Sequence, residues 1–502
     1  MDKKWWTLLA VCVGTFMLLL DVTIVVVALP DIQRALNAGF SDVQWVVDAY
    51  ALALASCLLT TGVLADRYGR RRLFAIGLVV FTAGSLLCGL AQSPLMLILS
   101  RAGQGVGGAI MFATSLALLG ESFRGKDRGV AFGVWGAITG IAVSLGPILG
   151  GVITTGISWR GIFLVNVPIG VLALGVTLWK LDESRAPHPG KLDLAGFALL
   201  TCGLVGLVYG LIRAGESSWG DDGAIVALTV GAVLLVAFLL TELLIPNPMF
   251  DLALFRKPTF VGGLCAAFAM NGSLFAMLLY LVLYLQNVLG YSALGTGTRL
   301  LVSSGAMLVA ATIAGRLSER VSARWLIGPG LLAVGIGLLL MSGLGATSSW
   351  THLIPGFIVS GLGAGFVNPP LASTAIGVVE PARAGMASGI NSTFRQVGLA
   401  TSIAALGSIF TTSLRNNLTG ALAHTPAAGY TDQIINAVRE GQSGGANSTI
   451  VPPALRPELQ QAISTSFTGA LNNLLTVTAV LALVGAVLSA VLIRDKDFAA
   501  RQ

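Results

Sequence analysis

Residues 62–74 read Gly62-Val-Leu-Ala-Asp-Arg-Tyr-Gly-Arg-Arg-Arg-Leu-Phe74, and they place four arginines between two apolar runs. Each charge inside hydrocarbon costs about 2.5–3.5 kcal/mol, so these arginines mark a short loop between two membrane spans. Loops rich in Lys and Arg remain in the cytoplasm. We therefore predict that this loop is cytoplasmic, which fixes the side of every other loop in the chain.

The composition is that of a polytopic helical membrane protein. Hydrophobic residues make up 55% of the 502 positions and charged residues 11%, and the mean hydropathy is +0.84. The net charge of +7 would point to nucleic acid in a soluble chain. Here, however, 21 of the 30 Lys and Arg residues fall on the side predicted to be cytoplasmic. The basic character therefore reflects topology, and no nucleic-acid partner is expected.

Fourteen apolar segments are long enough to cross a bilayer, if a span takes about 20 residues. They are 5–29, 43–64, 73–92, 95–120, 129–154, 161–180, 192–214, 223–244, 258–286, 294–315, 325–346, 351–377, 386–412 and 466–493. An even number places both termini on one side, and the distribution of positive charge makes that side the cytoplasm. The predicted fold class is an all-α polytopic membrane protein with 14 transmembrane helices and cytoplasmic termini.

A weak internal repeat divides the chain into two halves. The frame Gly-x-Leu-x-acid-Arg-x-x-x-Arg of residues 62–71 recurs at 315–324, and the Gly-x-Gly-x-Gly of residues 103–107 recurs at 361–365. If both halves begin in the cytoplasm, any insert between them needs an even number of spans. The sequence thus predicts six plus two plus six helices.

The corresponding domain boundaries follow from this count. Residues 1–190 form an amino-terminal six-helix bundle, 191–245 hold two linker helices, and 246–502 form a carboxyl-terminal six-helix bundle. The last bundle is predicted to contain a long extracytoplasmic loop at 413–465, because this stretch is rich in Gly, Pro, Asn, Ser and Thr.

Three ionisable residues within spans are candidates for proton coupling. Asp21 has no basic residue near it in the sequence, so we predict an isolated carboxyl that exchanges a proton in the outer half of the first span. The alternative is a neutral, hydrogen-bonded aspartic acid with a structural role. Asp48 is the second candidate, with the alternative that it reaches the outer interface. Arg101 needs a carboxylate or carbonyl partner inside the membrane, unless its side chain extends to the surface.

Two further clusters suggest moving helix contacts. In the arginine-rich loop, glycines allow tight turns and close approach, and an acid can pair with nearby arginines. This predicts a conformational switch made of Gly62, Asp66, Arg67, Gly69, Arg70 and Arg71, although a purely topological charge cluster remains the alternative. The fifth span carries small residues around a helix-bending proline, which suits a rocking interface: Gly140, Gly146, Pro147, Gly150 and Gly151.

Mixed aromatic, methionine and amide side chains in other spans suit a cavity that accepts varied apolar ligands. The candidates are Gln104, Met270, Asn271, Phe275, Tyr280 and Asn368. The alternative is that aromatic residues at helical spacing simply form the core. The sequence shows no phosphate-binding loop or catalytic set, and its five cysteines lie singly in apolar runs, so neither an enzyme nor a metal or cofactor site is expected.

Several of these stretches resemble a known family. Residues 62–72 resemble motif A of the major facilitator superfamily, and 21–30 resemble the first-span motif of its fourteen-span drug:proton antiporters of the EmrB/QacA type. Further similarities lie at 146–151, the antiporter motif, and at 159–170, 284–286 and 395–398. The resemblance implies the major facilitator fold and multidrug efflux by a proton-coupled antiporter that uses alternating access. It also implies that Arg101 takes part in proton transfer.

The expected partners are protons, the lipid bilayer and a small lipophilic substrate, neutral or cationic. The expected location is the cytoplasmic membrane of a bacterium, crossed many times. Two alternatives remain open: an exporter of one endogenous compound, such as an antibiotic, siderophore or lipid, and a membrane receptor or scaffold that does not transport.

Overall fold

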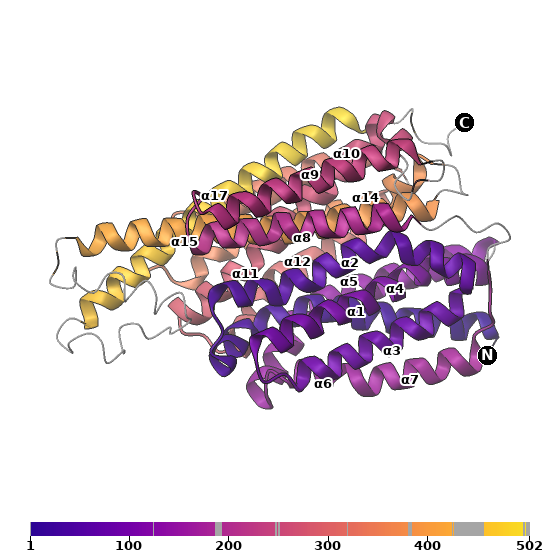
Figure 1. Cartoon of the computed structure of the whole chain (residues 1–502), viewed down its shortest axis with the longest axis horizontal. Coiled ribbons are helices and arrows are strands. Elements are labelled where there is room, and N and C mark those ends of the chain that lie inside the picture. The colour runs from indigo at the N-terminus through magenta and orange to yellow at the C-terminus, as the bar shows by residue number, and fades with distance from the viewer. Residues whose placement is uncertain are drawn as a thin grey trace.

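The computed structural model describes residues 2–123, 125–185, 193–245, 252–318, 320–379, 384–423 and 456–494, with single positions 248, 425 and 497. Within these ranges all regular secondary structure is helical, and most of the helices are long and run roughly along one direction (Figure 1). The amino-terminal elements are α1 (Lys3–Leu36), α2 (Phe40–Tyr68), α3 (Arg70–Gly89), α4 (Pro94–Ser122), α5 (Gly125–Gly156), α6 (Gly161–Leu164), α7 (Asn166–Lys180), α8 (Leu194–Glu216) and α9 (Asp222–Leu244). The remaining elements are η1 (Leu252–Arg256), α10 (Pro258–Met270), η2 (Asn271–Phe275), α11 (Ala276–Leu283), η3 (Tyr284–Val288), α12 (Ala293–Leu317), α13 (Ala323–Met341), η4 (Trp350–Leu353), α14 (Ile354–Gly377), α15 (Ala384–Leu422) and α17 (Arg456–Leu492).

Twelve helices of the described chain are long and apolar enough to cross a membrane, and the number rises to 14 if each of two bent helix pairs is one span. One bent pair is α2, which turns by 51° between Leu58 and Thr60. The other is α5, which turns by 45° between Val143 and Leu145. In α5 the cause is Pro147, which has no N–H to donate to the carbonyl of Val143. The predicted all-helical, membrane-spanning class is therefore confirmed, with 12 to 14 spans.

The two bundles repeat the same packing. Helix α4 packs between α2 and α3, and α14 packs in the same way between α12 and α13. The repeated glycines allow these contacts, because a Cβ atom on Gly105 would lie 2.6 Å from the carbonyl oxygen of Tyr50. Gly107 and Gly363 likewise face the backbones of α3 and α13. The antiparallel pair α8–α9 lies outside both bundles, where α8 packs against α2 and α15 (Figure 1).

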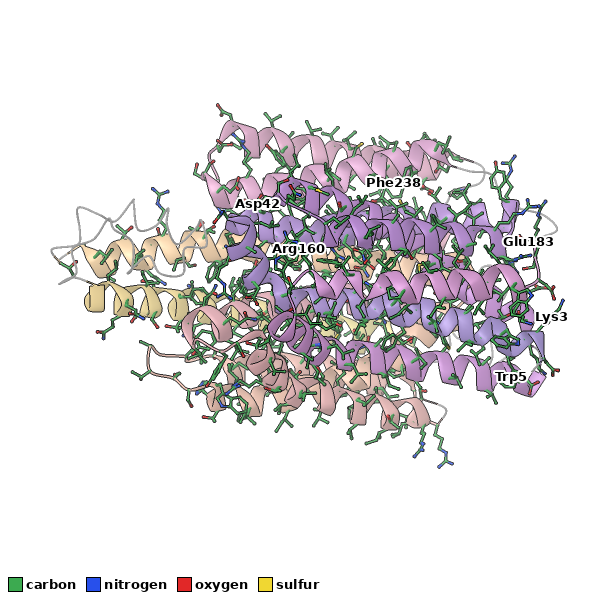
Figure 2. All side chains as sticks on the ribbon, turned by 90° about the horizontal axis from the view of Figure 1, so that it is seen from below. Lys3, Trp5, Asp42, Arg160, Glu183 and Phe238 are labelled. Carbon is green, nitrogen blue, oxygen red and sulfur yellow. The ribbon has the colours of Figure 1, made fainter. Side chains whose placement is uncertain are left out.

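Both termini lie at the same end of the molecule (Figure 1). Lys3 and Glu183 are at that end, and Asp42 and Arg160 are at the other (Figure 2). We call the first the arginine-rich end, because Arg70 follows the turn between α2 and α3 there, and the second the opposite end. The distribution of Lys and Arg in the sequence predicts that the arginine-rich end is cytoplasmic.

The segment 413–465 is more helical than the sequence suggests. Helix α15 continues to Leu422, so the first part of the predicted loop is helical. Helix α17 begins at Arg456, in agreement with the helix start that the sequence predicts at Pro457, whereas the short helical pattern predicted at 430–440 lies outside the described residues. The reason is an apolar stripe on α15, where Leu414, Leu418 and Leu422 are buried at four-residue intervals. Most of the intervening residues lie outside the described ranges.

Candidate functional site

A buried ion pair joins α1 to α4. Asp21 and Arg101 are 0% and 1% exposed, and Nη1 of Arg101 donates to Oδ2 of Asp21. The guanidinium also donates through Nε to the carbonyl oxygen of Val46 at 3.1 Å and lies 4.1 Å from the ring centroid of Tyr50. The ring face attracts the cation, so Arg101 is held on three sides. This burial excludes the alternative that Arg101 extends to the membrane surface.

Amide and hydroxyl groups complete the surroundings of Asp21. Its Oδ1 accepts from Nε2 of Gln104 at 2.8 Å and from Nδ2 of Asn166 at 3.3 Å. Both amides also donate to Oγ of Ser85 at 3.1 Å, and Ser85 donates to the carbonyl oxygen of Phe163 at 2.9 Å. The carboxylate therefore receives hydrogen bonds from three side chains, which is the pattern of an ionised group in a nearly closed network.

The prediction that Asp21 is isolated was wrong. Sequence neighbours carry no positive charge, but the fold brings Arg101 from α4, and Gln104 lies one turn farther along the same helix. Gln104 was predicted to line a substrate cavity, yet it is 0% exposed and belongs to this network. Sequence reasoning also missed Ser85 and Asn166. For Asn166 a signal existed, because it lies in the family-like stretch 159–170.

Asp48 is the second buried acid, and it differs from Asp21 in having no partner. It is 0% exposed, and neither carboxyl oxygen has a hydrogen-bond partner among the described residues. The alternative that it reaches the outer interface is therefore excluded. An unpaired ionised carboxylate is very costly at such a site, so the geometry suits a neutral carboxyl in this conformation.

The arginine-rich turn is held by acids that lie far apart in the sequence. Asp66 pairs with Arg70, at 2.9 Å, and Arg70 also approaches Glu121 at the end of α4, at 3.4 Å. The carboxylate of Glu183, which follows α7, accepts from the backbone N–H groups of residues 71 and 72 at 3.1 and 3.2 Å. Glu183 thus caps α3 at its positive end. Sequence analysis identified Asp66 and missed both glutamates.

The two glycines of this cluster behave differently. Gly69 has φ = +115°, and a Cβ atom there would lie 2.6 Å from the carboxylate of Glu183, so the turn requires glycine. At Gly62 no described atom would lie within 4 Å of a Cβ atom, so the close approach predicted there is absent from this conformation. Arg67 lies over the ring of Tyr68, and Arg71 donates to the carbonyl oxygen of Leu178. Of the predicted arginine partners of Asp66, Arg70 alone forms the pair among the described contacts.

The glycines of α5 serve two different contacts. Gly146 faces Thr23 of α1, and a Cβ atom on Gly150 would lie 2.7 Å from the carbonyl oxygen of Ile24. Both glycines therefore face α1, which belongs to the same amino-terminal bundle as α5. Gly151 faces the other bundle, because its Cβ atom would lie 2.7 Å from the carbonyl oxygen of Ala293 in α12. Gly151 thus lies at a contact between the two bundles, whereas Gly146 and Gly150 do not, and the rocking of this interface stays a prediction.

Toward the opposite end the two bundles are in direct contact. Gln44 donates to the carbonyl oxygen of Ile403 at 2.9 Å, and Gln286 donates to that of Val27 at 2.7 Å. Leu294 donates its N–H to Oγ1 of Thr155 at 3.1 Å. Each of these hydrogen bonds joins an amino-terminal helix to a carboxyl-terminal element.

Aromatic rings fill the same junction. The ring centroids of Phe40 and Phe410 are 5.6 Å apart, and those of Tyr280 and Phe410 are 5.7 Å apart. Tyr280 is 0% exposed and donates to the carbonyl oxygen of Ile403 at 2.7 Å. It was predicted to line a cavity, but in this conformation it belongs to the closed junction.

Toward the arginine-rich end the bundles separate. On α5, a Cβ atom on Gly140 would meet only Leu308 of α12, at 3.7 Å, and one on Gly136 would meet no described atom within 4 Å. On α2, the last described hydrogen bond to α15 joins Thr393 to the carbonyl oxygen of Ala55, at 3.2 Å. Gly62, two turns farther along the same face of α2, has open space around it. The described residues therefore join the two bundles at the opposite end and leave space between them at the arginine-rich end.

The remaining predicted cavity residues divide into two groups. Met270 is 0% exposed and lies in the core, as the alternative interpretation holds. Asn271, Phe275 and Asn368 are partly exposed. Asn271 and Phe275 bound the π-helical turn η2, a local widening that is frequent at functional sites and that the sequence did not predict.

Comparison with known proteins agrees with this architecture. Residues 11–403 match the family described as Major Facilitator Superfamily. The chain is 39% identical over 404 residues to the multidrug resistance protein Stp of Mycobacterium tuberculosis (strain CDC 1551 / Oshkosh), which covers 80% of this chain and 75% of that protein. It is 33% identical over 502 residues to the tetracenomycin C resistance and export protein of Streptomyces glaucescens, which covers 96% and 90%.

A solved structure shares the fold. The bacterial homolog of the human lysosomal transporter Spinster, in its inward-facing and occupied conformation, aligns with a TM-score of 0.64 over 98% of this chain and 97% of that chain, at 18% identity. Relatives named for drug resistance and export, together with this fold, indicate a transporter rather than an enzyme. The chain is a multi-pass membrane protein that belongs to the Major Facilitator Superfamily.

Proposed function

We propose that this chain is a proton-coupled antiporter that exports lipophilic, drug-like compounds by alternating access across the cytoplasmic membrane of a bacterium. The observation that carries the proposal is the buried pair of Asp21 and Arg101, an interaction that one proton can interrupt. The relatives named for multidrug and antibiotic resistance support the substrate class. In this proposal the chain has the fourteen spans of the EmrB/QacA type, arranged as six plus two plus six.

Protonation of Asp21 would leave the guanidinium of Arg101 buried without a counter-charge. Loss of one partner from a buried ion pair costs about 3–5 kcal/mol. A proton that enters down 100 mV releases about 2.3 kcal/mol, and a pH difference of one unit releases about 1.4 kcal/mol more. These energies are of the same size, so proton entry is able to drive a rearrangement of α1 against α4.

The charge distribution assigns the arginine-rich end to the cytoplasm, so the present conformation is inward-facing. In the transport cycle the bundles rock until the arginine-rich end closes and the opposite end opens. The pair of Asp66 and Arg70 and the cap by Glu183 set the position of the α2–α3 turn in one of these states. The residues of this turn therefore act on the conformational equilibrium and not on the substrate.

A second candidate is an exporter dedicated to one compound. A relative whose name specifies a single compound, tetracenomycin C, favours this candidate, and it aligns over 96% of this chain. The two candidates share one mechanism and differ in breadth, so transport of several structurally unrelated compounds would favour multidrug export.

The test uses purified protein in liposomes with an acidic lumen and a pH-sensitive dye inside. If the proposal holds, ethidium accumulates against its gradient while protons leave, and a proton ionophore abolishes both movements. Protein-free liposomes control for passive entry. An ethidium distribution that is the same with and without the proton gradient would refute antiport.

A further inference from the structure

Arg395 of α15 is a charge inside the predicted membrane span for which the described residues provide no carboxylate. It lies 11 residues beyond Ala384, the beginning of α15, which is about 16 Å along the axis and near the middle of a hydrocarbon core. Between residues 258 and 422 the sequence contains two acids, Glu319 and Glu380, and both lie outside the described residues. Among the described residues, no ion pair involves Arg395.

Neutral amides hold this guanidinium in place. Nη1 donates to Oδ1 of Asn368 on α14 at 3.0 Å, and Nε donates to Oδ1 of Asn391, one turn earlier on α15, at 3.4 Å. Both amides offer their oxygen atoms, so they orient the cation without neutralising it. An arginine has five N–H donors, and these contacts use two of them.

A second donor at the same place has no partner. Asn391 is 4% exposed, and its Nδ2 makes no hydrogen bond within the described part of the chain. An unused buried donor costs about 1–3 kcal/mol, so a ligand that accepts from it would recover this loss. Arg395 and Asn368 are themselves partly exposed. Exposure of an arginine to lipid at this depth is costly, so an aqueous surrounding is expected for its exposed side.

Asp48, the buried acid of the facing helix α2, is not positioned to be the counter-ion. Thr393, two residues before Arg395, contacts Ala55 of α2. Asp48 lies seven residues from Ala55 toward the opposite end, about 10 Å along the helix axis. Its closed surroundings, with 0% exposure, separate it further from the open side of the molecule. Arg101, in the amino-terminal bundle, differs from Arg395 because it pairs with the carboxylate of Asp21.

From this arrangement we infer that Arg395, Asn391 and Asn368 form the subsite that binds an acidic oxygen group of the exported compound, such as a carboxylate or phenolate. The inference rests on the proposed export function and makes it more specific. The guanidinium provides charge and three donors that no described contact uses, and Nδ2 of Asn391 provides a fourth. The substrate class then includes acidic compounds, in addition to the neutral and cationic ones expected from the sequence.

The test compares two dyes that share a xanthene ring system and differ in charge. Fluorescein carries carboxylate and phenolate groups, whereas rhodamine 123 is a cationic ester. Fluorescence anisotropy with the full chain in lipid nanodiscs gives the affinity for each dye. The wild-type protein is expected to bind fluorescein, and Arg395→Gln is expected to weaken that binding by about tenfold or more while rhodamine 123 stays within about twofold.

Two further variants separate binding from folding. Asn391→Asp keeps the side-chain shape and places a carboxylate beside Arg395, so it should remove fluorescein binding as Arg395→Gln does. Arg415→Gln removes the same charge from an exposed position on the same helix and should change neither affinity. Equal loss of both dyes in Arg395→Gln would indicate a structural role only and overturn the inference.

No fluorescein binding by the wild-type protein would also overturn it, as would unchanged fluorescein binding in Asn391→Asp. These outcomes are distinct from failure of the proposed function. That failure would appear as the absence of proton-driven accumulation of either dye in liposomes, whatever the affinities are.

Discussion

Asp21 and Arg101 concentrate the ionic chemistry of the amino-terminal bundle in one buried contact. Both side chains are held by further hydrogen bonds, so the pair has little freedom to separate while Asp21 stays ionised. A proton changes this balance directly, because a neutral carboxyl no longer compensates the guanidinium. In the proposed mechanism, proton binding at Asp21 is therefore the step that changes the contact between α1 and α4.

Asp21→Asn is expected to abolish proton-driven accumulation and to lower the free energy of unfolding by about 3–5 kcal/mol, because Arg101 loses its counter-charge. Accumulation in liposomes and chemical unfolding in detergent measure the two effects. Asp31→Asn is the matched control on the same helix, since Asp31 pairs with Arg34 at an exposed position. Its effect on stability should stay within about 1 kcal/mol.

The double variant Asp21→Asn with Arg101→Gln removes both charges. It should recover part of the lost stability, because no uncompensated ion remains buried, but it should not recover transport. Normal proton-driven export by Asp21→Asn would contradict the assignment of Asp21.

Asp66→Asn removes the partner of Arg70 at the turn between α2 and α3. Because both side chains are partly exposed, the loss of stability should stay within about 1 kcal/mol. Turnover should fall by roughly tenfold while substrate affinity stays unchanged, since the residue affects a two-state equilibrium and does not contact ligand. Transport rates and dye affinity measure the two quantities, and equal turnover in mutant and wild type would make the cluster purely topological.

At the scale of elements, α5 carries two kinds of glycine. Toward α1 they allow a close contact inside one bundle, and toward α12 they line the contact between the bundles, which changes in the proposed transport cycle. Gly151 lies in the closed part of the second contact, and Gly136 lies in the open part on the same side of the helix. A bulky residue should therefore have opposite effects at the two positions.

Gly151→Leu is expected to prevent closure at the opposite end, because its side chain would occupy the space of Ala293. Gly136→Leu fits the present conformation but should prevent closure at the arginine-rich end. Spin-label distances across each end should then shift in opposite directions from the wild-type distribution. The same shift in both variants would refute a rocking motion about α5 and α12.

Gly146→Leu and Gly150→Leu serve as the controls for position. They would separate α1 from α5 within one bundle, so loss of folded protein is expected instead of a shift between conformations.

On the scale of the whole molecule, the two bundles form a closed junction at one end and an opening at the other. In the proposed exchange, the net charge that crosses the membrane in each cycle depends on the charge of the substrate. One proton exchanged for a neutral compound moves one charge, so 100 mV and one pH unit together support a gradient of several hundredfold. A monovalent cation exchanged one for one responds only to the pH term, about tenfold.

Export of a monovalent cation beyond about tenfold at one pH unit therefore requires a second proton, and Asp48 is the site we expect to carry it. Asp48→Asn should reduce the cation gradient to that limit while leaving export of a neutral compound intact. Because Asp48 has no partner here, stability should change by less than about 1 kcal/mol. Steady-state dye gradients at fixed pH difference and potential measure this, and an unchanged cation gradient would exclude Asp48.

The sequence by itself determined the class of protein, the approximate spans and the repeat of two bundles. These features follow from local rules, because hydrocarbon excludes charge and requires apolar helices of a set length. It also identified Asp21, Asp48, Arg101 and the turn at Gly69 as exceptional, since each is a costly residue in its own segment.

The tertiary structure alone decided which of these residues meet. Asp21 and Arg101 are 80 positions apart, and Asn166 is still farther along the chain, so no local pattern relates them. Likewise, only the packing of helices distinguishes Gly151 from Gly150, one peptide bond away. Packing also gives Arg101 an acidic partner, whereas Arg395 has none among the described residues. Pairing between distant segments depends on how helices are arranged around one another, and that arrangement is set by the sum of many contacts rather than by the residues that carry the charge.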